Sequence, residues 1–138
     1  PVHPYPASNW QLPVAGMNEV KIAANDTNRV IIDVRESERY RGIKEPIDKI
    51  AGHIPSAINL PFTENLDEID FFLPQEKLRK KYLKIFEGQP SENIIVHCGS
   101  GVTSCHTLLA ISIAGLEVPK LYVGSWSEWS RNDLPIVG

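Results

Sequence analysis

The chain of 138 residues is long enough for one domain built around a single hydrophobic core. Hydrophobic residues make up 42% and charged residues 22% of it, as in soluble globular proteins, and the net charge of −3 excludes the dense basic face of a nucleic-acid-binding protein. No stretch reaches the roughly 18 apolar residues of a membrane span, so we expect neither a nucleic acid nor a membrane as partner.

The first residues are rich in proline, with four prolines before residue 14. This composition predicts an extended arm or an interdomain linker over residues 1–17, followed by one domain over residues 18–138. The chain opens at Pro1 and shows no signal-peptide pattern. We expect a cytoplasmic protein, with the periplasm as the alternative.

Helical and strand-like patterns alternate along the rest of the chain. In order they predict a helix over 16–26, a strand over 29–34, one helical turn over 37–42, a strand over 57–60, a helix over 74–87, a strand over 93–97, a helix over 102–115, a strand over 120–124 and a last helical turn over 125–131. Ser125 is the expected N-cap of that last turn. Such alternation implies parallel pairing through right-handed crossovers. The predicted fold is therefore α/β, with one sheet covered by helices on both faces.

The stretch IIVHCGSGVTSCH (94–106) carries the chemistry. Cys98 follows a predicted buried strand, and Gly99 and Gly101 come before a predicted helix. At this edge of a parallel sheet, the free N–H groups of the loop and of the first helical turn lower a thiol pKa and hold an anion. The alternative is a buried cysteine before an ordinary strand-to-helix turn. These residues by themselves are compatible with both interpretations.

Four residues of types that bind metals also fall in this stretch, namely His97, Cys98, Cys105 and His106. Adjacent strand residues point to opposite faces, and the two cysteines lack the short spacing of zinc sites. We therefore expect no metal and no cofactor. Cys105 lies on the apolar helix, where an inert core position is the favoured interpretation.

Four stretches, in the same order, resemble the signatures of the rhodanese superfamily: DVRESERYRG (33–42), AGHIPSAINLPF (51–62), CGSGVT (98–103) and YVGSWSEW (122–129). The CGSGVT loop is most similar to the catalytic, C-terminal domain of 3-mercaptopyruvate sulfurtransferases. The resemblance implies a five-stranded parallel sheet. It also implies sulfur transfer from 3-mercaptopyruvate or thiosulfate, through a cysteine persulfide, to a thiol or cyanide.

The resemblance also implies roles for individual residues. Cys98 would be the nucleophile, and Ser100 would contact the substrate and relay a proton. Arg39 would bind the donor's carboxylate or sulfonate, against the alternative of a surface ion pair. The remaining substrate-binding residues are those of the loop: Gly99, Ser100, Gly101, Val102 and Thr103. Framework roles are expected for Asp33, Arg35 and His53, and packing roles for Trp126 and Trp129.

Two features depart from that family. A second substrate-binding arginine of the mercaptopyruvate enzymes is replaced here by Ile47, in KEPID (44–48). The second departure is length, because the similar proteins contain two rhodanese domains in tandem. We therefore expect as partners a small sulfur donor, a thiol acceptor such as a thioredoxin-like protein, and a second rhodanese domain.

Three other functions are compatible with this superfamily. A phosphatase requires an arginine at the sixth position after the cysteine, where this chain has Ser104. A non-catalytic binding module commonly lacks the nucleophile, whereas Cys98 is present here. A persulfide carrier, which would receive sulfur from another protein and hand it on, is an open alternative.

Overall fold

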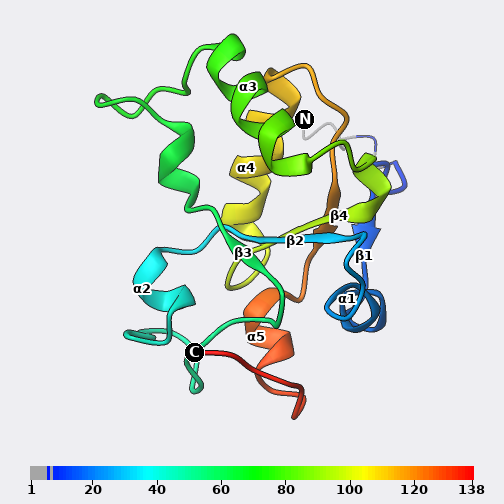
Figure 1. The fold of residues 1–138 in the computed structure, drawn as a ribbon, viewed down its shortest axis with the longest axis vertical. Coiled ribbons are helices and arrows are strands. Elements are labelled where there is room, and N and C mark those ends of the chain that lie inside the picture. The colour runs from blue at the N-terminus through cyan, green and yellow to red at the C-terminus, as the bar shows by residue number, and fades with distance from the viewer. Residues whose placement is uncertain (1–5, 7) are drawn as a thin grey trace, which may run out of the picture.

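The computed structural model describes residues 6 and 8–138. Its centre is a five-stranded sheet in the order β1-β5-β4-β2-β3, and every neighbouring pair of strands is parallel (Figure 1). The strands are β1 (Val14–Ala15), β2 (Val30–Asp33), β3 (Ile58–Asn59), β4 (Ile94–His97) and β5 (Lys120–Tyr122). The predicted α/β fold with a five-stranded parallel sheet is confirmed.

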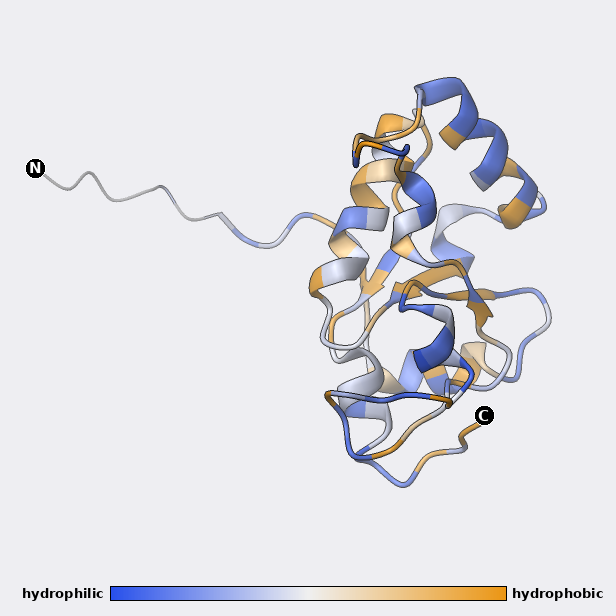
Figure 2. Cartoon of the chain, turned by 90° about the vertical axis from the view of Figure 1, so that its left-hand side faces the viewer, coloured by the Kyte–Doolittle hydropathy of each residue, from blue (hydrophilic) through white to orange (hydrophobic). Residues whose placement is uncertain are grey.

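Helices cover both faces of the sheet. They are α1 (Met17–Ala23), α2 (Ser37–Tyr40), α3 (Gln75–Phe86), α4 (Val102–Ile113) and α5 (Ser125–Trp129), with short 3₁₀ turns η1 (Phe62–Asn65) and η2 (Ser91–Asn93). Helices α3 and α4 pack on one face, and α1 and α5 pack on the other. Figure 2 shows α3, the largely blue helix at the top, with a few orange residues among polar ones, as expected of a helix that buries one side.

The two central strands are buried on both faces because helices lie on each side of them. In β4, Ile94 and Val96 belong to the core under α3 and α4, while Ile95 belongs to the core under α1 and α5. In β2, Ile32 and Ile31 divide in the same way. This explains why both strands are near-continuous apolar runs in the sequence rather than alternating ones.

The proline-rich segment leads into the edge of the sheet. Residues 1–5 and 7 of the predicted arm lie outside the described residues. Val14 and Ala15 pair with Leu121 and Tyr122 of β5, so the segment ends in a strand that the sequence pattern did not predict. A strand of two residues is too short to show a periodicity.

The strand register determines where the functional residues meet. Asp33, the last residue of β2, pairs with His97, the last residue of β4. The loops that follow these two strands therefore start side by side at the carboxyl edge of the sheet, where ligands bind in folds of this class. Within residues 6 and 8–138, no helix is long and apolar enough to cross a membrane.

Candidate active site

Cys98 is the first residue after β4, and its sulfur faces the start of α4. The backbone N–H of Gly101 donates to the sulfur at 3.2 Å, and the Ser104 hydroxyl lies 3.5 Å from it. Gly101 has a φ of +85°, and a Cβ there would lie 2.6 Å from the carbonyl oxygen of Val123. Only glycine therefore allows this loop to curl around the sulfur.

These contacts control the protonation of the thiol. Burial raises the pKa of Cys98, since only 2% of the residue is exposed. Hydrogen bonds from the Ser104 hydroxyl and from the backbone N–H groups of Ser104, Ser100 and Gly101 outweigh burial, and the pKa is lowered below its usual value of 9.0. The sulfur thus has the surroundings of a thiolate nucleophile rather than those of an inert core cysteine.

Residues of α5 support the cysteine loop through hydrogen bonds. The Ser125 hydroxyl donates to the Tyr122 carbonyl at 2.8 Å and accepts the Cys98 N–H at 3.2 Å. The N–H groups of Trp126 and Ser127 donate to the carbonyls of Cys98 and Gly99 at 3.0 and 2.9 Å. The prediction of Ser125 as an N-cap is wrong, because Gly124 is the N-cap and Ser125 is the first residue of the helix, where its hydroxyl holds the cysteine loop.

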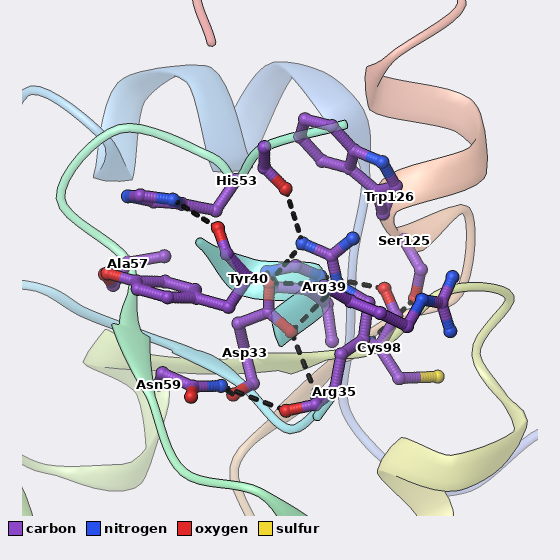
Figure 3. Close-up of polar contacts among 12 residues, drawn as sticks. Asp33, Arg35, Arg39, Tyr40, His53, Ala57, Asn59, Cys98, Ser125 and Trp126 are labelled. Carbon is purple, nitrogen blue, oxygen red and sulfur yellow. Dashed lines mark hydrogen bonds and ion pairs between the residues drawn. The ribbon is translucent and has the colours of Figure 1, made fainter. Parts of the chain in front are cut away.

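Arg39, on α2, reaches the same place. Its guanidinium forms a bidentate pair with Glu45, with Nη2 and Nε at 2.7 and 3.2 Å from the two carboxylate oxygens. A Cβ on Gly99 would lie 3.3 Å from Nη2, so the guanidinium packs directly against the cysteine loop. In Figure 3 the side chain of Arg39 extends toward Cys98. The site therefore contains one cation beside the thiol.

A buried ion pair forms the floor of the site (Figure 3). The Asp33 carboxylate accepts hydrogen bonds from the Arg35 guanidinium at 2.7 and 3.1 Å, and both side chains are almost fully buried. Arg35 also donates to the Gly52 carbonyl at 2.7 Å and lies over the Trp126 ring. Asp33 and Arg35 thus have the framework role that the sequence predicted.

Other framework residues hold the turn around His53 and pack in the core. The ring of His53 stacks on Tyr40 with 3.8 Å between centroids, and its backbone forms an antiparallel bridge with Val137. Trp126 and Trp129 are buried in the core between the sheet, α1 and α5. These three residues therefore serve the fold, as predicted.

The cysteine and the arginine share a cleft of about 240 Å³. Arg39, Cys98, Gly99 and Thr103 line it, together with Arg35, Glu36, Pro46, Ile47 and Phe62. Ser100 is exposed and Val102 is 74% exposed, and neither lines the cleft. The structure thus brings Cys98, Gly99, Thr103 and Arg39 together, while Ser100 and Gly101 contribute to the sulfur through their backbone N–H groups.

Sequence reasoning missed three residues that support this cleft. Ser104 donates to the sulfur, Glu45 pairs with Arg39, and Phe62 lines the opening. The position of Ser104 in the first turn of the helix was a signal for its role, since the first turn of α4 faces the loop. Among the described residues, no group of three His, Cys, Asp or Glu side chains is placed to hold a metal ion. The predicted core position of Cys105 is wrong, because Cys105 lies on an exposed side of α4.

Comparison with known proteins agrees with this geometry. The sequence model of the family described as "Rhodanese-like domain" matches residues 17–132, which is most of the chain. The chain belongs to the rhodanese-like domain family. The match ends close to the end of α5, so it includes every strand of the sheet except β1.

Curated relatives of this rhodanese-like domain are named as sulfurtransferases. The chain is 48% identical over 99 residues to a probable 3-mercaptopyruvate sulfurtransferase of Pseudomonas aeruginosa, which covers 72% of this chain and 35% of that protein. It is 40% identical over 131 residues to 3-mercaptopyruvate sulfurtransferase of Escherichia coli, covering 89% of this chain and 44% of the relative. The rhodanese-like domain thus spans less than half the length of these relatives.

Solved structures give the same result. The chain superposes on 3-mercaptopyruvate sulfurtransferase from Leishmania major with a TM-score of 0.71 at 28% identity, covering 94% of this chain and 37% of that one. The Tum1 protein from Saccharomyces cerevisiae gives 0.72 at 28% identity, covering 91% and 46%. Both comparisons support the fold and its family.

Proposed function

We propose that this rhodanese-like domain is a sulfurtransferase that moves a sulfane sulfur from 3-mercaptopyruvate or thiosulfate to a thiol or cyanide. The observation that carries the proposal is the Cys98 sulfur, which receives hydrogen bonds from Gly101 and Ser104 and opens into the cleft that Arg39 lines. Relatives named as sulfurtransferases support it.

The first half of the reaction loads the cysteine. The Cys98 thiolate attacks the sulfur of 3-mercaptopyruvate, an S–S bond forms, and the C–S bond of the donor breaks. The electron pair of that bond leaves on carbon as pyruvate enolate, which takes up a proton to give pyruvate. The converging N–H groups of residues 100, 101 and 104 stabilise the negative charge of the sulfur before and after the attack.

The second half of the reaction transfers the outer sulfur from Cys98 to the acceptor. An acceptor thiolate attacks the outer sulfur of the persulfide, and Cys98 leaves as the thiolate, so the site returns to its first state without an outside oxidant or reductant. In this proposal, Arg39 holds the donor's carboxylate or sulfonate, and Ser100, exposed at the rim, contacts the substrate and relays a proton. A thioredoxin-like protein supplies the acceptor thiol, and a second rhodanese domain completes the cleft.

Intact-mass spectrometry after incubation with 3-mercaptopyruvate tests the proposal. The expected result is a gain of one sulfur atom, which cyanide removes as thiocyanate. Cys98→Ser should show no gain, whereas Cys105→Ser, the matched variant at the other cysteine, should gain sulfur as the wild type does.

Other outcomes separate the alternatives. Sulfur uptake from neither 3-mercaptopyruvate nor thiosulfate would overturn the proposal and favour a binding module. Uptake from a persulfidated donor protein alone, with no turnover of small donors, would favour a persulfide carrier. Sulfur bound to Cys105 rather than Cys98 would contradict the assignment of the nucleophile.

A further inference from the structure

We propose that Glu45 fixes the orientation of Arg39 and cancels its charge, and thereby selects sulfur donors with one negative charge over donors with two. This inference rests on the proposed function, because it concerns the anion that enters the same cleft. In it, Glu45 is a positioning residue, which acts on the donor through Arg39.

The carboxylate of Glu45 is held on several sides. It accepts hydrogen bonds from Nη2 and Nε of Arg39 at 2.7 and 3.2 Å and from Nη1 of Arg35 at 3.3 Å. The backbone N–H groups of Ile47 and Asp48 donate to it at 3.1 and 3.2 Å. Only 4% of its side chain is exposed. A group with this many partners is a fixed part of the site and not a mobile surface carboxylate.

These contacts keep Glu45 charged. Burial raises the pKa of its carboxyl, but hydrogen bonds from Arg39 and from the backbone N–H groups outweigh burial and hold the pKa below its usual value of 4.5. At neutral pH, a carboxylate therefore stands beside the guanidinium that faces the donor.

Contacts on two edges also fix the orientation of the Arg39 guanidinium. Glu45 occupies the Nε–Nη2 edge of the guanidinium. The remaining edge, formed by Nη1 and Nη2, faces Gly99, where a Cβ would lie 3.5 and 3.3 Å from the two nitrogens. Gly99 therefore covers the Nη1–Nη2 edge, and a donor carboxylate reaches the guanidinium from the cleft that Arg39, Gly99 and Cys98 line.

The charges joined by ion pairs around the cleft balance before a donor enters, and Glu36 adds a further acidic side chain to the lining. Arg39 and Arg35 both contact Glu45, and Asp33 pairs with Arg35. Asp48 lies 3.8 Å from Arg39 and 3.5 Å from the exposed Arg131. These ion pairs join three guanidinium groups and three carboxylates, namely those of Arg35, Arg39, Arg131, Asp33, Glu45 and Asp48. A cleft of this kind tolerates a singly charged 3-mercaptopyruvate better than a doubly charged thiosulfate.

Donor selectivity tests this inference. In Glu45→Gln, kcat/KM for thiosulfate divided by kcat/KM for 3-mercaptopyruvate should rise on the order of tenfold, the effect of one unit charge several ångströms from the donor at an effective dielectric of about 20. Glu38→Gln removes an equal charge from an exposed position on α2 and should leave the ratio unchanged. An equal fall for both donors in Glu45→Gln would mean a merely structural role and would overturn the inference.

A second measurement uses the wild-type protein, so it does not depend on the variant folding. Methanesulfonate and sulfate are similar in shape but carry one and two charges. Methanesulfonate should protect Cys98 from iodoacetamide at a lower concentration than sulfate does. Equal protection, or better protection by sulfate, would overturn the inference. Alkylation does not depend on sulfur transfer, so the protection experiment tests the inference separately from the proposed function. The proposed function would be contradicted by a different result, a wild type that takes up no sulfur.

Discussion

The Ser104 hydroxyl lies 3.5 Å from the Cys98 sulfur and belongs to the first turn of the helix that begins after the cysteine loop. Ser104 is fully buried, so its hydroxyl has no competing water. Backbone N–H groups of the same loop and helix face the same sulfur. The Ser104 hydroxyl and the local backbone N–H groups therefore act together on the Cys98 sulfur. The hydroxyl can be removed by substitution without moving the backbone.

Ser104→Ala should shift the reactivity of Cys98 to higher pH. Loss of the hydroxyl removes the largest of the hydrogen bonds that lower the pKa of the thiol against the effect of burial. Sulfur uptake at neutral pH should fall about fivefold, since a bond of this length contributes roughly 1 kcal/mol. The midpoint of the rate of alkylation by iodoacetamide against pH measures the shift. Ser112→Ala, at an exposed position of the same helix, should leave the profile unchanged.

Arg39→Ala should weaken donor binding without affecting the thiol. Loss of a charge-assisted contact of about 1.5–3 kcal/mol predicts a fall in kcat/KM for 3-mercaptopyruvate of roughly 10- to 100-fold. Alkylation of Cys98 by the uncharged iodoacetamide should stay close to the wild-type rate. Arg41→Ala, an exposed arginine on the same turn, is the control. Unchanged donor kinetics in Arg39→Ala would remove Arg39 from the site.

Gly101→Ala should cost far more stability than Gly88→Ala. Both glycines have positive φ, +85° and +79°, so each substitution carries about 1–2 kcal/mol of backbone strain. Only at Gly101 would the new Cβ also meet backbone, 2.6 Å from the Val123 oxygen, whereas nothing lies within 4 Å of it at Gly88. Urea unfolding of both variants measures the difference. Equal losses would show that the loop relaxes away from Val123.

Asp33 should make the protein sensitive to acid. Burial raises the pKa of Asp33, but His97 and then Arg35 outweigh it and lower the pKa below 3.8. The pKa is thus lower in the folded than in the unfolded state. The resulting stabilisation is complete above about pH 4 and is lost as the pH falls through the folded-state pKa.

Asp33→Asn tests this dependence through urea unfolding at a series of pH values. The variant should be about 3–5 kcal/mol less stable at neutral pH, because it removes the carboxylate that lies nearest to the buried Arg35 charge. It should also lose less stability than the wild type below pH 4. Asp70→Asn, at an exposed position, should follow the wild type throughout. If Asp33→Asn and the wild type lost equal stability as the pH falls below 4, the assignment of this pH dependence to Asp33 would be contradicted.

Local patterns were sufficient to predict most of the fold. Apolar runs over β2 and β4 and the helical patterns of α3 and α4 located these elements to within one or two residues, because the central strands are buried along their length and the helices are buried at helical spacing. Strand β1 escaped prediction because its two residues owe their conformation to pairing with β5, far away in the sequence.

Residue spacing predicted the site only where its chemistry is local, whereas Arg39 was predicted through the family resemblance. Gly99, Gly101 and Cys98 are neighbours in the chain, so their backbone geometry could be inferred from spacing. Glu45 and Ser125 could not, since Glu45 acts through a contact with Arg39 across a loop, and Ser125 reaches Cys98 from a different strand end. Such contacts depend on how separate loops converge at one edge of the sheet.

The bridge between His53 and Val137 has a mechanical consequence. Two backbone hydrogen bonds, of 2.7 and 3.0 Å, join Val137 to His53, and the preceding residue, Gly52, holds Arg35 through its carbonyl. A force applied through Val137 would therefore act on the turn that holds Arg35 before it acts on the sheet. A tether attached to the exposed side of α3 would instead pull on the helices at the other face of the sheet. In single-molecule stretching, attachment at Val137 and attachment at α3 should therefore disturb sulfur transfer at very different forces.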